Sequence, residues 1–156
     1  MKKSKRAQAA DERVSQMLSK LKSRQFRITP QRLFVLRTLA ESDGHPTVEE
    51  IYEQVKVEFP TTSLATVYKT IALLKELDEV LELGFKDGSN RFDGNKPYPH
   101  PHAICTGCKK IMDSELSQVE QLNEEMSRKT GFKIHSHRLD FFGLCPDCQA
   151  KDHKNH

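Results

Sequence analysis

Apolar positions in the first half of the chain recur with the period of a helix and predict four helices. The first covers about residues 11–24, behind a polar stretch at 1–10 that we expect to be disordered. The second follows Thr29-Pro30, a capping residue with proline at the first helical position. The third opens with the capping box Thr47–Glu50, and the fourth, with Thr62 or Ser63 as its cap, covers about residues 63–77.

The pattern changes from a helical period to alternation after the fourth helix. Val80–Phe85 predicts a strand, Lys86–Ser89 a turn, and Arg91–Asp93 the start of the return strand. Helices followed by a β-hairpin are typical of a winged helix-turn-helix. In such proteins the second helix of the pair, here 63–77, enters the major groove of DNA.

The second half predicts a smaller unit behind the proline-containing connector Gly94–Pro99. We expect short strands near 102–105 and 110–113, then a helix at about 115–130. Its apolar stripe should face inward, and strand structure should follow over Phe132–Leu144. The residues of the stripe are Leu116, Val119, Leu122 and Met126.

These elements predict an α+β fold with an N-terminal winged helix-turn-helix and a C-terminal α/β dimerisation domain. The second domain is small for a self-sufficient core, so a structural metal and a dimer partner would both stabilise it. The expected parts are a disordered basic tail (1–10), a winged-helix domain (11–93), a linker (94–99), a metal-binding dimerisation domain (100–149) and a polar tail (150–156).

The distribution of charge along the chain is more informative about binding partners than the net charge. The net charge is only +3, but residues 1–33 hold ten Lys and Arg side chains against Asp11 and Glu12. A basic end of this kind either follows a phosphate backbone or forms a solvated tail. No apolar run approaches the length of a membrane span and no signal peptide is present, so we expect a cytoplasmic protein without a membrane partner.

The cysteines form two C-x-x-C pairs, Cys105 with Cys108 and Cys145 with Cys148. Cytosolic chains rarely keep structural disulfides, and paired C-x-x-C motifs usually bind zinc there. Four thiolates complete a closed tetrahedral site, which is structural rather than catalytic. A thiol switch, in which oxidation releases zinc, would use the same four residues.

Histidines and carboxylates form a second candidate site. His100 and His102 alternate along a strand and therefore share a face, while Asp93, Asp113 and His45 stand in neighbouring segments. Three imidazoles with carboxylates suit iron(II), manganese(II) or zinc. The alternative is that His45 is an ordinary loop residue and that the two aspartates are turn carboxylates.

His135 and His137 also alternate, either as surface and packing residues or as an auxiliary third metal site. A metallohydrolase would use His100, His102 and a carboxylate around an open metal position. The sequence offers no signature of the general base or substrate pocket which that reaction needs. We therefore expect no enzyme and no small-molecule substrate. A structural zinc protein that binds another protein is a further alternative.

The polar side of helix 63–77 carries Ser63, Thr66, Tyr68, Lys69 and Thr70. Hydroxyls and a lysine contact phosphates, and Thr or Tyr also contacts a thymine methyl. This pattern favours a DNA-reading surface, although an ordinary solvated helix face has the same composition.

Six co-linear motifs resemble the ferric uptake regulator (Fur) superfamily, over about residues 12–149. They are Arg27–Arg32, His45–Thr47, Ser63–Tyr68, Asn90–Asp93, His102–Cys108 and Gly143–Cys148. The resemblance implies a homodimeric, metal-dependent repressor that binds a double-stranded DNA operator. It further implies that the four cysteines hold structural Zn²⁺.

The resemblance also implies a regulatory site for Fe²⁺ or Mn²⁺ that bridges the two domains. Its ligands would be His45, Asp93, His100, His102 and Asp113. The metal would then select one conformation of a hinged dimer, and DNA would select the same one.

The same resemblance assigns DNA contacts to Tyr68 and Lys69 on the recognition helix and to Arg27 ahead of Thr29-Pro30. Ser63 and Thr66 belong to the same predicted surface.

Asp113 stands where iron-sensing members generally carry Glu, and it resembles the peroxide-sensing branch, PerR. That branch implies oxidation of a ligand histidine, here His45 or His100, followed by release of DNA. A sensor of iron or zinc availability is the alternative within the superfamily. The connector Gly94–Pro99 is slightly longer than in that branch, a departure that bears on metal preference.

Overall fold

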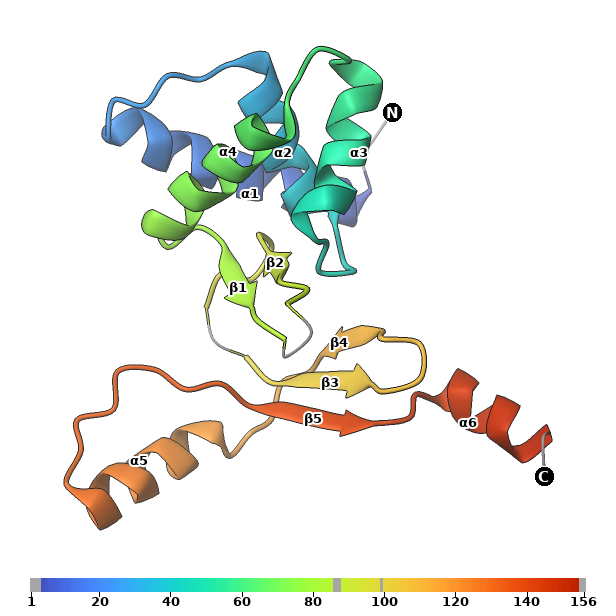
Figure 1. Ribbon diagram of the computed structural model, residues 1–156. Coiled ribbons are helices and arrows are strands. Elements are labelled where there is room, and N and C mark those ends of the chain that lie inside the picture. Colours follow the sequence, from blue (N-terminus) through green and yellow to red (C-terminus); the bar gives the residue numbers. More distant parts are fainter. Residues whose placement is uncertain (1–3, 86–87, 99, 155–156) are drawn as a thin grey trace. The chain divides into compact units, whose positions relative to one another are not determined.

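The computed structural model describes residues 4–85, 88–98 and 100–154. The chain is α+β and divides into two compact units, residues 1–97 and 98–156 (Figure 1). Residues 86 and 87 of the expected wing turn, residue 99 of the expected linker, and the ends of both expected tails lie outside the described residues.

The first unit contains four helices followed by a hairpin. The helices are α1 (Lys5–Ser23), α2 (Pro30–Glu41), α3 (Val48–Glu58) and α4 (Leu64–Glu76), and the strands are β1 (Leu81–Leu83) and β2 (Arg91–Asp93). The side chains of Thr29, Thr47 and Ser63 each accept a backbone hydrogen bond at the start of α2, α3 and α4. The capping signals in the sequence therefore predicted these three helix starts correctly.

Helix α1 begins earlier than the sequence pattern predicted. Ser4 caps it by accepting from the amide of Ala7, so residues 5–10 are helical rather than a disordered tail. Ala10 is buried and joins the core of the unit. The charged residues around Ala10 hide this contribution, because only one small apolar side chain marks the buried side of the added turns.

The apolar stripes of the helices meet in one hydrophobic core. The largest fully buried apolar side chains of this core come from α1 to α4, with Phe92 of β2 added at its edge. These side chains are Met17, Leu21, Val35, Leu36, Leu39, Ile51, Val55, Val67 and Leu74.

The hairpin is antiparallel, with Leu81 opposite Asp93 and Leu83 opposite Arg91. The loop before α3 pairs with β2 along the edge that does not face β1. The amide of Phe92 donates to the carbonyl oxygen of Pro46 at 3.0 Å, and Thr47 forms an isolated antiparallel bridge with Arg91. This pairing brings the start of α3 alongside β2.

The second unit contains β3 (His102–Cys105), β4 (Ile111–Asp113), α5 (Val119–Thr130), β5 (Asp140–Gly143) and α6 (Pro146–Lys154). The strand order is β4-β3-β5, with β3 antiparallel to β4 and parallel to β5 (Figure 1). Its buried apolar residues, among those that the structure describes, are Pro101, Ile104, Cys105 and Ile111. A unit with so small a core needs another source of stability.

Two predictions for the second unit were wrong. Strand structure covers only Asp140–Gly143 of the expected Phe132–Leu144. The apolar stripe before and along α5 does not face inward, since Leu116, Leu122 and Met126 are 45%, 54% and 55% exposed. Periodicity shows that a helix has an apolar side, but it does not show what covers that side.

Among the described residues, no helix is long and apolar enough to cross a lipid bilayer.

Candidate metal centres

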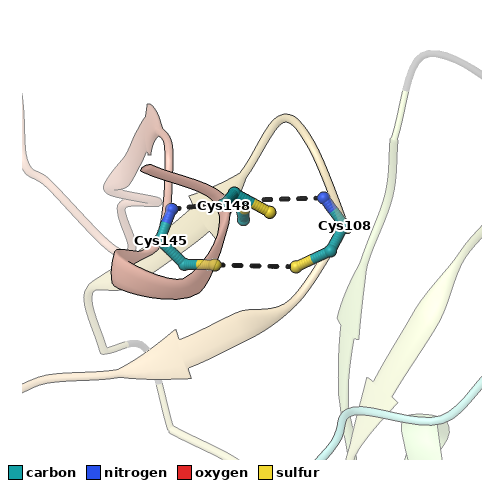
Figure 2. Close-up of side chains that lie close together, drawn as sticks. Cys108, Cys145 and Cys148 are labelled. Atoms are coloured by element: carbon teal, nitrogen blue, oxygen red, sulfur yellow. Dashed lines mark hydrogen bonds between the residues drawn. The ribbon is translucent and has the colours of Figure 1, made fainter. Parts of the chain in front are cut away.

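The four cysteines lie together in the second unit. Their sulfur atoms are all within 4.8 Å of one another, and those of Cys108 and Cys145 are 3.8 Å apart (Figure 2). A tetrahedral zinc ion with Zn–S bonds of about 2.3 Å requires sulfurs about 3.8 Å apart. All four cysteines are free, and the spacing far exceeds the disulfide bond length of about 2.0 Å. The site therefore fits a structural Zn²⁺.

Strand register brings the two C-x-x-C pairs together. Cys105 ends β3 and lies opposite Gly143 of β5, so the chain that leaves β5 carries Cys145 to the same end of the sheet. Between Cys105 and Cys108 the chain turns tightly. A Cβ atom on Gly107 would lie 3.1 Å from the sulfur of Cys148, so glycine leaves room for the fourth thiol.

Hydrogen bonding already favours a thiolate in this cluster. The backbone amides of Cys145 and Cys108 donate to the sulfur of Cys105 at 3.3 and 3.5 Å, and these bonds lower the pKa of Cys105 to about 6. Hydrogen bonding to Cys145 and Cys105 raises the pKa of Cys148 to about 12. Neighbouring thiols thus resist a second negative charge, and a divalent cation removes that penalty when all four become ligands.

In the first unit, His45 and Asp93 form a buried pair. The distance from Nε2 of His45 to Oδ2 of Asp93 is 3.1 Å, and the two side chains are 3% and 5% exposed. The pairing of Pro46 and Thr47 with β2 explains this proximity, because its register places His45 opposite Asp93. His45 has a φ of 52°, a conformation that a non-glycine residue adopts at an energetic cost.

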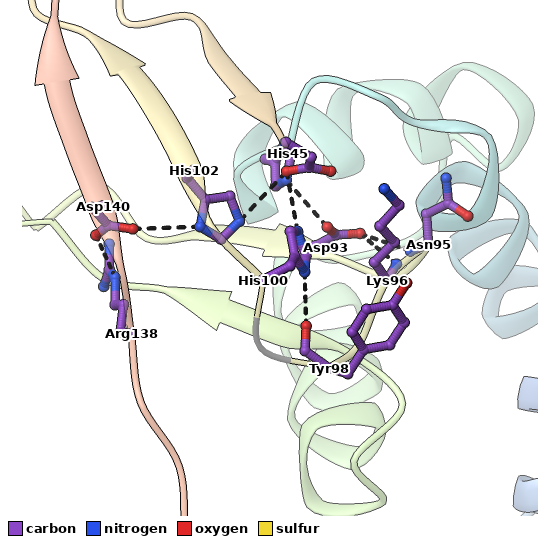
Figure 3. Close-up of polar contacts among 10 residues, drawn as sticks. His45, Asp93, Asn95, Lys96, Tyr98, His100, His102, Arg138 and Asp140 are labelled. Carbon is purple, nitrogen blue, oxygen red and sulfur yellow. Dashed lines mark hydrogen bonds and ion pairs between the residues drawn. The ribbon is translucent and has the colours of Figure 1, made fainter. Parts of the chain in front are cut away.

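The other carboxylate oxygen of Asp93 has separate partners. Oδ1 accepts from the amides of Asn95 and Lys96, each at 2.9 Å (Figure 3). These two bonds fix the carboxylate, so Oδ2 remains directed at the imidazole of His45.

In the second unit, His100, His102 and Asp113 form a cluster around one oxygen atom. Oδ1 of Asp113 lies 3.1 Å from Nε2 of His100 and 3.5 Å from Nε2 of His102. His102 and Asp113 are register partners across β3 and β4, which explains their contact. Both histidines are buried, and Asp113 is 23% exposed.

The opposite ring nitrogens of these histidines face acceptors. Nδ1 of His100 is 2.7 Å from the carbonyl oxygen of Tyr98, and Nδ1 of His102 is 3.4 Å from Oδ1 of Asp140 (Figure 3). A carbonyl oxygen only accepts, so Nδ1 of His100 carries the proton and a neutral ring presents a lone pair at Nε2.

Two such lone pairs directed at a carboxylate oxygen repel it unless a proton or a cation lies between them. Two imidazoles and one carboxylate are a ligand set for a divalent transition metal and recur at iron(II) sites with open positions.

The recognition-helix residues fall into two groups. Tyr68 and Lys69 are exposed on α4, and the hydroxyl of Tyr68 donates to Oε1 of Glu49 at 2.9 Å. The hydroxyl of Ser63 accepts from the amide of Thr66 and lies 3.0 Å from its side-chain oxygen, so both have local roles at the cap. Thr70 is 1% exposed, which corrects its expected place on the polar side.

The remaining candidates lie outside these clusters. Arg27 is exposed ahead of α2, and its carbonyl oxygen accepts from Arg32 at 2.7 Å. His135 is exposed, whereas Nδ1 of His137 lies 3.1 Å from the side-chain amide of Asn123. Neither His135 nor His137 belongs to any of the clusters of metal-ligand side chains found among the described residues.

Sequence reasoning missed the groups behind the histidines. Asp140 and the carbonyl oxygen of Tyr98 face the Nδ1 atoms of the two imidazoles, but neither stands out in the sequence. The alternation around His102 identifies its face of the strand, yet the neighbour across a parallel pair depends on register, which the sequence pattern alone leaves open.

Comparison with known proteins gives one family. The model of the Ferric uptake regulator family matches residues 23–142. The chain is 35% identical over 144 residues to the peroxide-responsive repressor PerR of Staphylococcus aureus. This alignment covers 92% of this chain and 97% of that protein. Identity to the repressor of the same name from Staphylococcus saprophyticus is 36% over 141 residues, or 90% and 95% of the two chains.

Solved structures agree with this result. The ferric uptake regulator Fur of Helicobacter pylori, described as having three functional metal binding sites, has a TM-score of 0.75 and 25% identity, covering 90% of this chain and 93% of that one. PerR from Streptococcus pyogenes has a TM-score of 0.51 and 30% identity, covering 87% and 92%.

Proposed function

The chain belongs to the Ferric uptake regulator family, and from this premise we propose that it is a peroxide-responsive, metal-dependent transcriptional repressor. The observation that carries the proposal is the cluster of His100, His102 and Asp113, in which two imidazole nitrogens face one carboxylate oxygen. Such a cluster binds a divalent cation, and the PerR relatives are repressors that respond to peroxide.

We propose that one regulatory ion takes ligands from both units. His45 and Asp93 would come from the first unit, and His100, His102 and Asp113 from the second. Each set is preorganised within its own unit, since hydrogen bonds fix Asp93 in one and His100 in the other. An ion that binds both sets would fix the angle between the units, and DNA would favour the same conformation.

The donor set fits Fe²⁺ or Mn²⁺ at this regulatory site, whereas the all-sulfur set takes Zn²⁺. Bound iron(II) would supply the chemistry that activates hydrogen peroxide. One oxygen atom of the peroxide would be added to the ring of His45 or His100, and water would be released. An oxidised imidazole is a poorer ligand, so the ion would dissociate, the hinge would relax and the repressor would leave its operator.

Asp113 is the residue that favours the peroxide branch, together with the PerR relatives. A sensor of iron or zinc availability is the second candidate, because the similarity to the H. pylori Fur structure covers nearly the whole chain. In both candidates the protein is a metal-dependent repressor. They differ only in the cause of metal loss from the regulatory site, which is ligand oxidation in one and a low metal concentration in the other. We propose a regulator rather than an enzyme in both cases, and a cytoplasmic one.

The DNA-binding surface proposed here is centred on α4. Tyr68 and Lys69 are exposed there, with Ser63 and Thr66 at its start and Arg27 ahead of α2. The proposed partner is a double-stranded operator bound by a homodimer. The exposed apolar residues of the second unit supply a surface that a second copy would cover, including Leu122, Met126, Phe141 and Phe142.

The test of this function is metal-dependent DNA retention. Zinc-loaded protein with and without added Mn²⁺ is used to select fragments from a random DNA pool, and affinity for the selected operator is measured by fluorescence anisotropy. We expect sequence-selective binding only with Mn²⁺, and we expect His45→Ala to abolish that dependence without loss of zinc or helix content. Equal operator binding with and without Mn²⁺, or unchanged binding by His45→Ala, would contradict the proposal.

A further inference from the structure

The face of the second-unit sheet that carries His102 also carries an acidic residue from the strand on its other side. β5 pairs with β3 in parallel, and Asp140 is the register partner of His102. Residues opposite each other on neighbouring strands point to the same face. The ring of His102 therefore lies between two carboxylates, Asp113 of β4 and Asp140 of β5.

The two carboxylates meet different nitrogens of the ring. Nε2 of His102 faces Asp113 at 3.5 Å, and Nδ1 faces Oδ1 of Asp140 at 3.4 Å. His102 is 1% exposed and Asp140 is 11% exposed, so water is largely excluded between Nδ1 and its carboxylate. The second oxygen of Asp140, Oδ2, accepts from Nε of Arg138 at 2.6 Å (Figure 3).

This chain of contacts has a chemical consequence for the imidazole. A carboxylate beside Nδ1 holds the proton there, leaves Nε2 as the ligand nitrogen and makes it a stronger donor. Arg138 orients the carboxylate and balances its charge, which lowers the cost of burying it. His100 differs, because its Nδ1 faces the neutral carbonyl oxygen of Tyr98.

We propose that Asp140, held by Arg138, is a positioning residue that orients His102 and strengthens it as a ligand of the regulatory metal. The proposal rests on the proposed function, in which His102 binds that metal. It makes the two second-unit histidines unequal: His102 is the ligand with an anionic neighbour, and His100 has only a neutral one.

The test measures Mn²⁺ affinity of the zinc-loaded protein by calorimetric titration against a competing chelator, without DNA. Asp140→Asn keeps the shape of the side chain but removes its charge, so we expect affinity about 10–100-fold weaker. Asp140→Glu restores a carboxylate and should recover most of that loss. Arg138→Gln, which leaves the carboxylate in place, should weaken binding less than Asp140→Asn.

The matched control is Asp152→Asn, which removes an exposed carboxylate from α6 of the same unit and should leave Mn²⁺ affinity unchanged. Zinc content and the melting temperature before Mn²⁺ is added show whether each variant is folded. A purely structural role for Asp140 would lower that melting temperature without a charge-dependent change in affinity.

The experiment distinguishes failure of the positioning role of Asp140 from failure of the proposed regulatory site. If folded Asp140→Asn binds Mn²⁺ as tightly as the parent while His102→Ala binds it poorly, the positioning role is wrong and the proposed function stands. Should His102→Ala also bind Mn²⁺ normally, His102 is not a ligand and both the positioning role and the proposed regulatory site are wrong.

Discussion

The buried guanidinium of Arg13 donates from Nε to the carbonyl oxygen of Gly94 at 2.6 Å and so joins α1 to the residue that follows Asp93. The same guanidinium donates to the carbonyl oxygen of Glu79 at 2.7 Å and pairs with its carboxylate at 2.8 Å. A Cβ atom on Gly94 would lie 2.7 Å from Cβ of Leu39, so the chain is also packed closely against α2. These contacts fix the end of β2 that carries a proposed metal ligand.

Arg13→Ala should destabilise the first unit by about 3 kcal/mol, because it leaves a largely buried carboxylate and two carbonyl oxygens without their cation. Arg37→Ala is the control, since its ion pairs with Asp11 and Glu41 are exposed and contribute at most about 1 kcal/mol. Urea unfolding followed by circular dichroism measures both. Equal losses in the two variants would contradict a structural role for Arg13.

Cys105→Ser should release zinc and unfold the second unit while leaving the first unit helical. The second unit has a very small apolar core, so metal binding supplies much of its folding free energy. Zinc content by elemental analysis and limited proteolysis test this expectation. A variant that retains stoichiometric zinc and resists proteolysis over residues 98–154 would rule out the four-cysteine site. Ser114→Ala, which alters an exposed side chain of the same unit, is the matched control.

Met126→Glu should shift the protein from dimer to monomer. Met126 lies on the apolar side of α5 and is 55% exposed in the single chain, so a second copy that covers it would have to bury the new charge. Gln121→Glu adds the same charge at an exposed polar position of α5 and should leave the dimer intact. Analytical ultracentrifugation of zinc-loaded protein distinguishes the two. Unchanged sedimentation of Met126→Glu would place the dimer contact elsewhere.

The sequence predicted the first unit better than the second, for a physical reason. Caps at Thr29, Thr47 and Ser63 are local signals, and each marks the start of an observed helix. The apolar stripe that includes Leu122 was predicted to be buried, but it is exposed in the single chain. A pattern of apolar positions has the same form whether a core or another chain covers it.

The same difference holds for the candidate sites: ligands close together in the sequence were predicted, whereas contacts that depend on strand pairing were not. The C-x-x-C pairs are recognised from their spacing in the sequence, and the structure brings all four sulfurs together. The link from His102 to Asp140 depends on the parallel register of β3 and β5, which are separated along the chain by β4 and α5. No local pattern around Asp140 indicates this partner, so only the structure reveals it.

Glu49→Gln should lower the pKa of Tyr68 towards its ordinary value of 10.0. The hydrogen bond to Glu49 raises this pKa, and partial desolvation and the negative charge of the carboxylate act in the same direction. The stabilising effect of the bond is therefore present below the ordinary tyrosine pKa and is lost as pH rises through the raised value. The ring signal of isotope-labelled Tyr68, assigned with Tyr68→Phe, reports the titration by NMR. An unshifted midpoint in Glu49→Gln would show that the contact does not form in solution.

Peroxide sensing is tested most directly by locating the oxygen atom that hydrogen peroxide adds to the protein. The zinc-loaded protein is filled anaerobically with iron(II), bound to its selected operator and treated with stoichiometric hydrogen peroxide. Peptide mass spectrometry then locates added oxygen while anisotropy follows DNA release, with the Mn²⁺-loaded protein as the control. We expect one added oxygen on His45 or His100, with loss of DNA binding, in the iron form only. Intact histidines and a retained operator would contradict peroxide sensing and leave a sensor of metal availability.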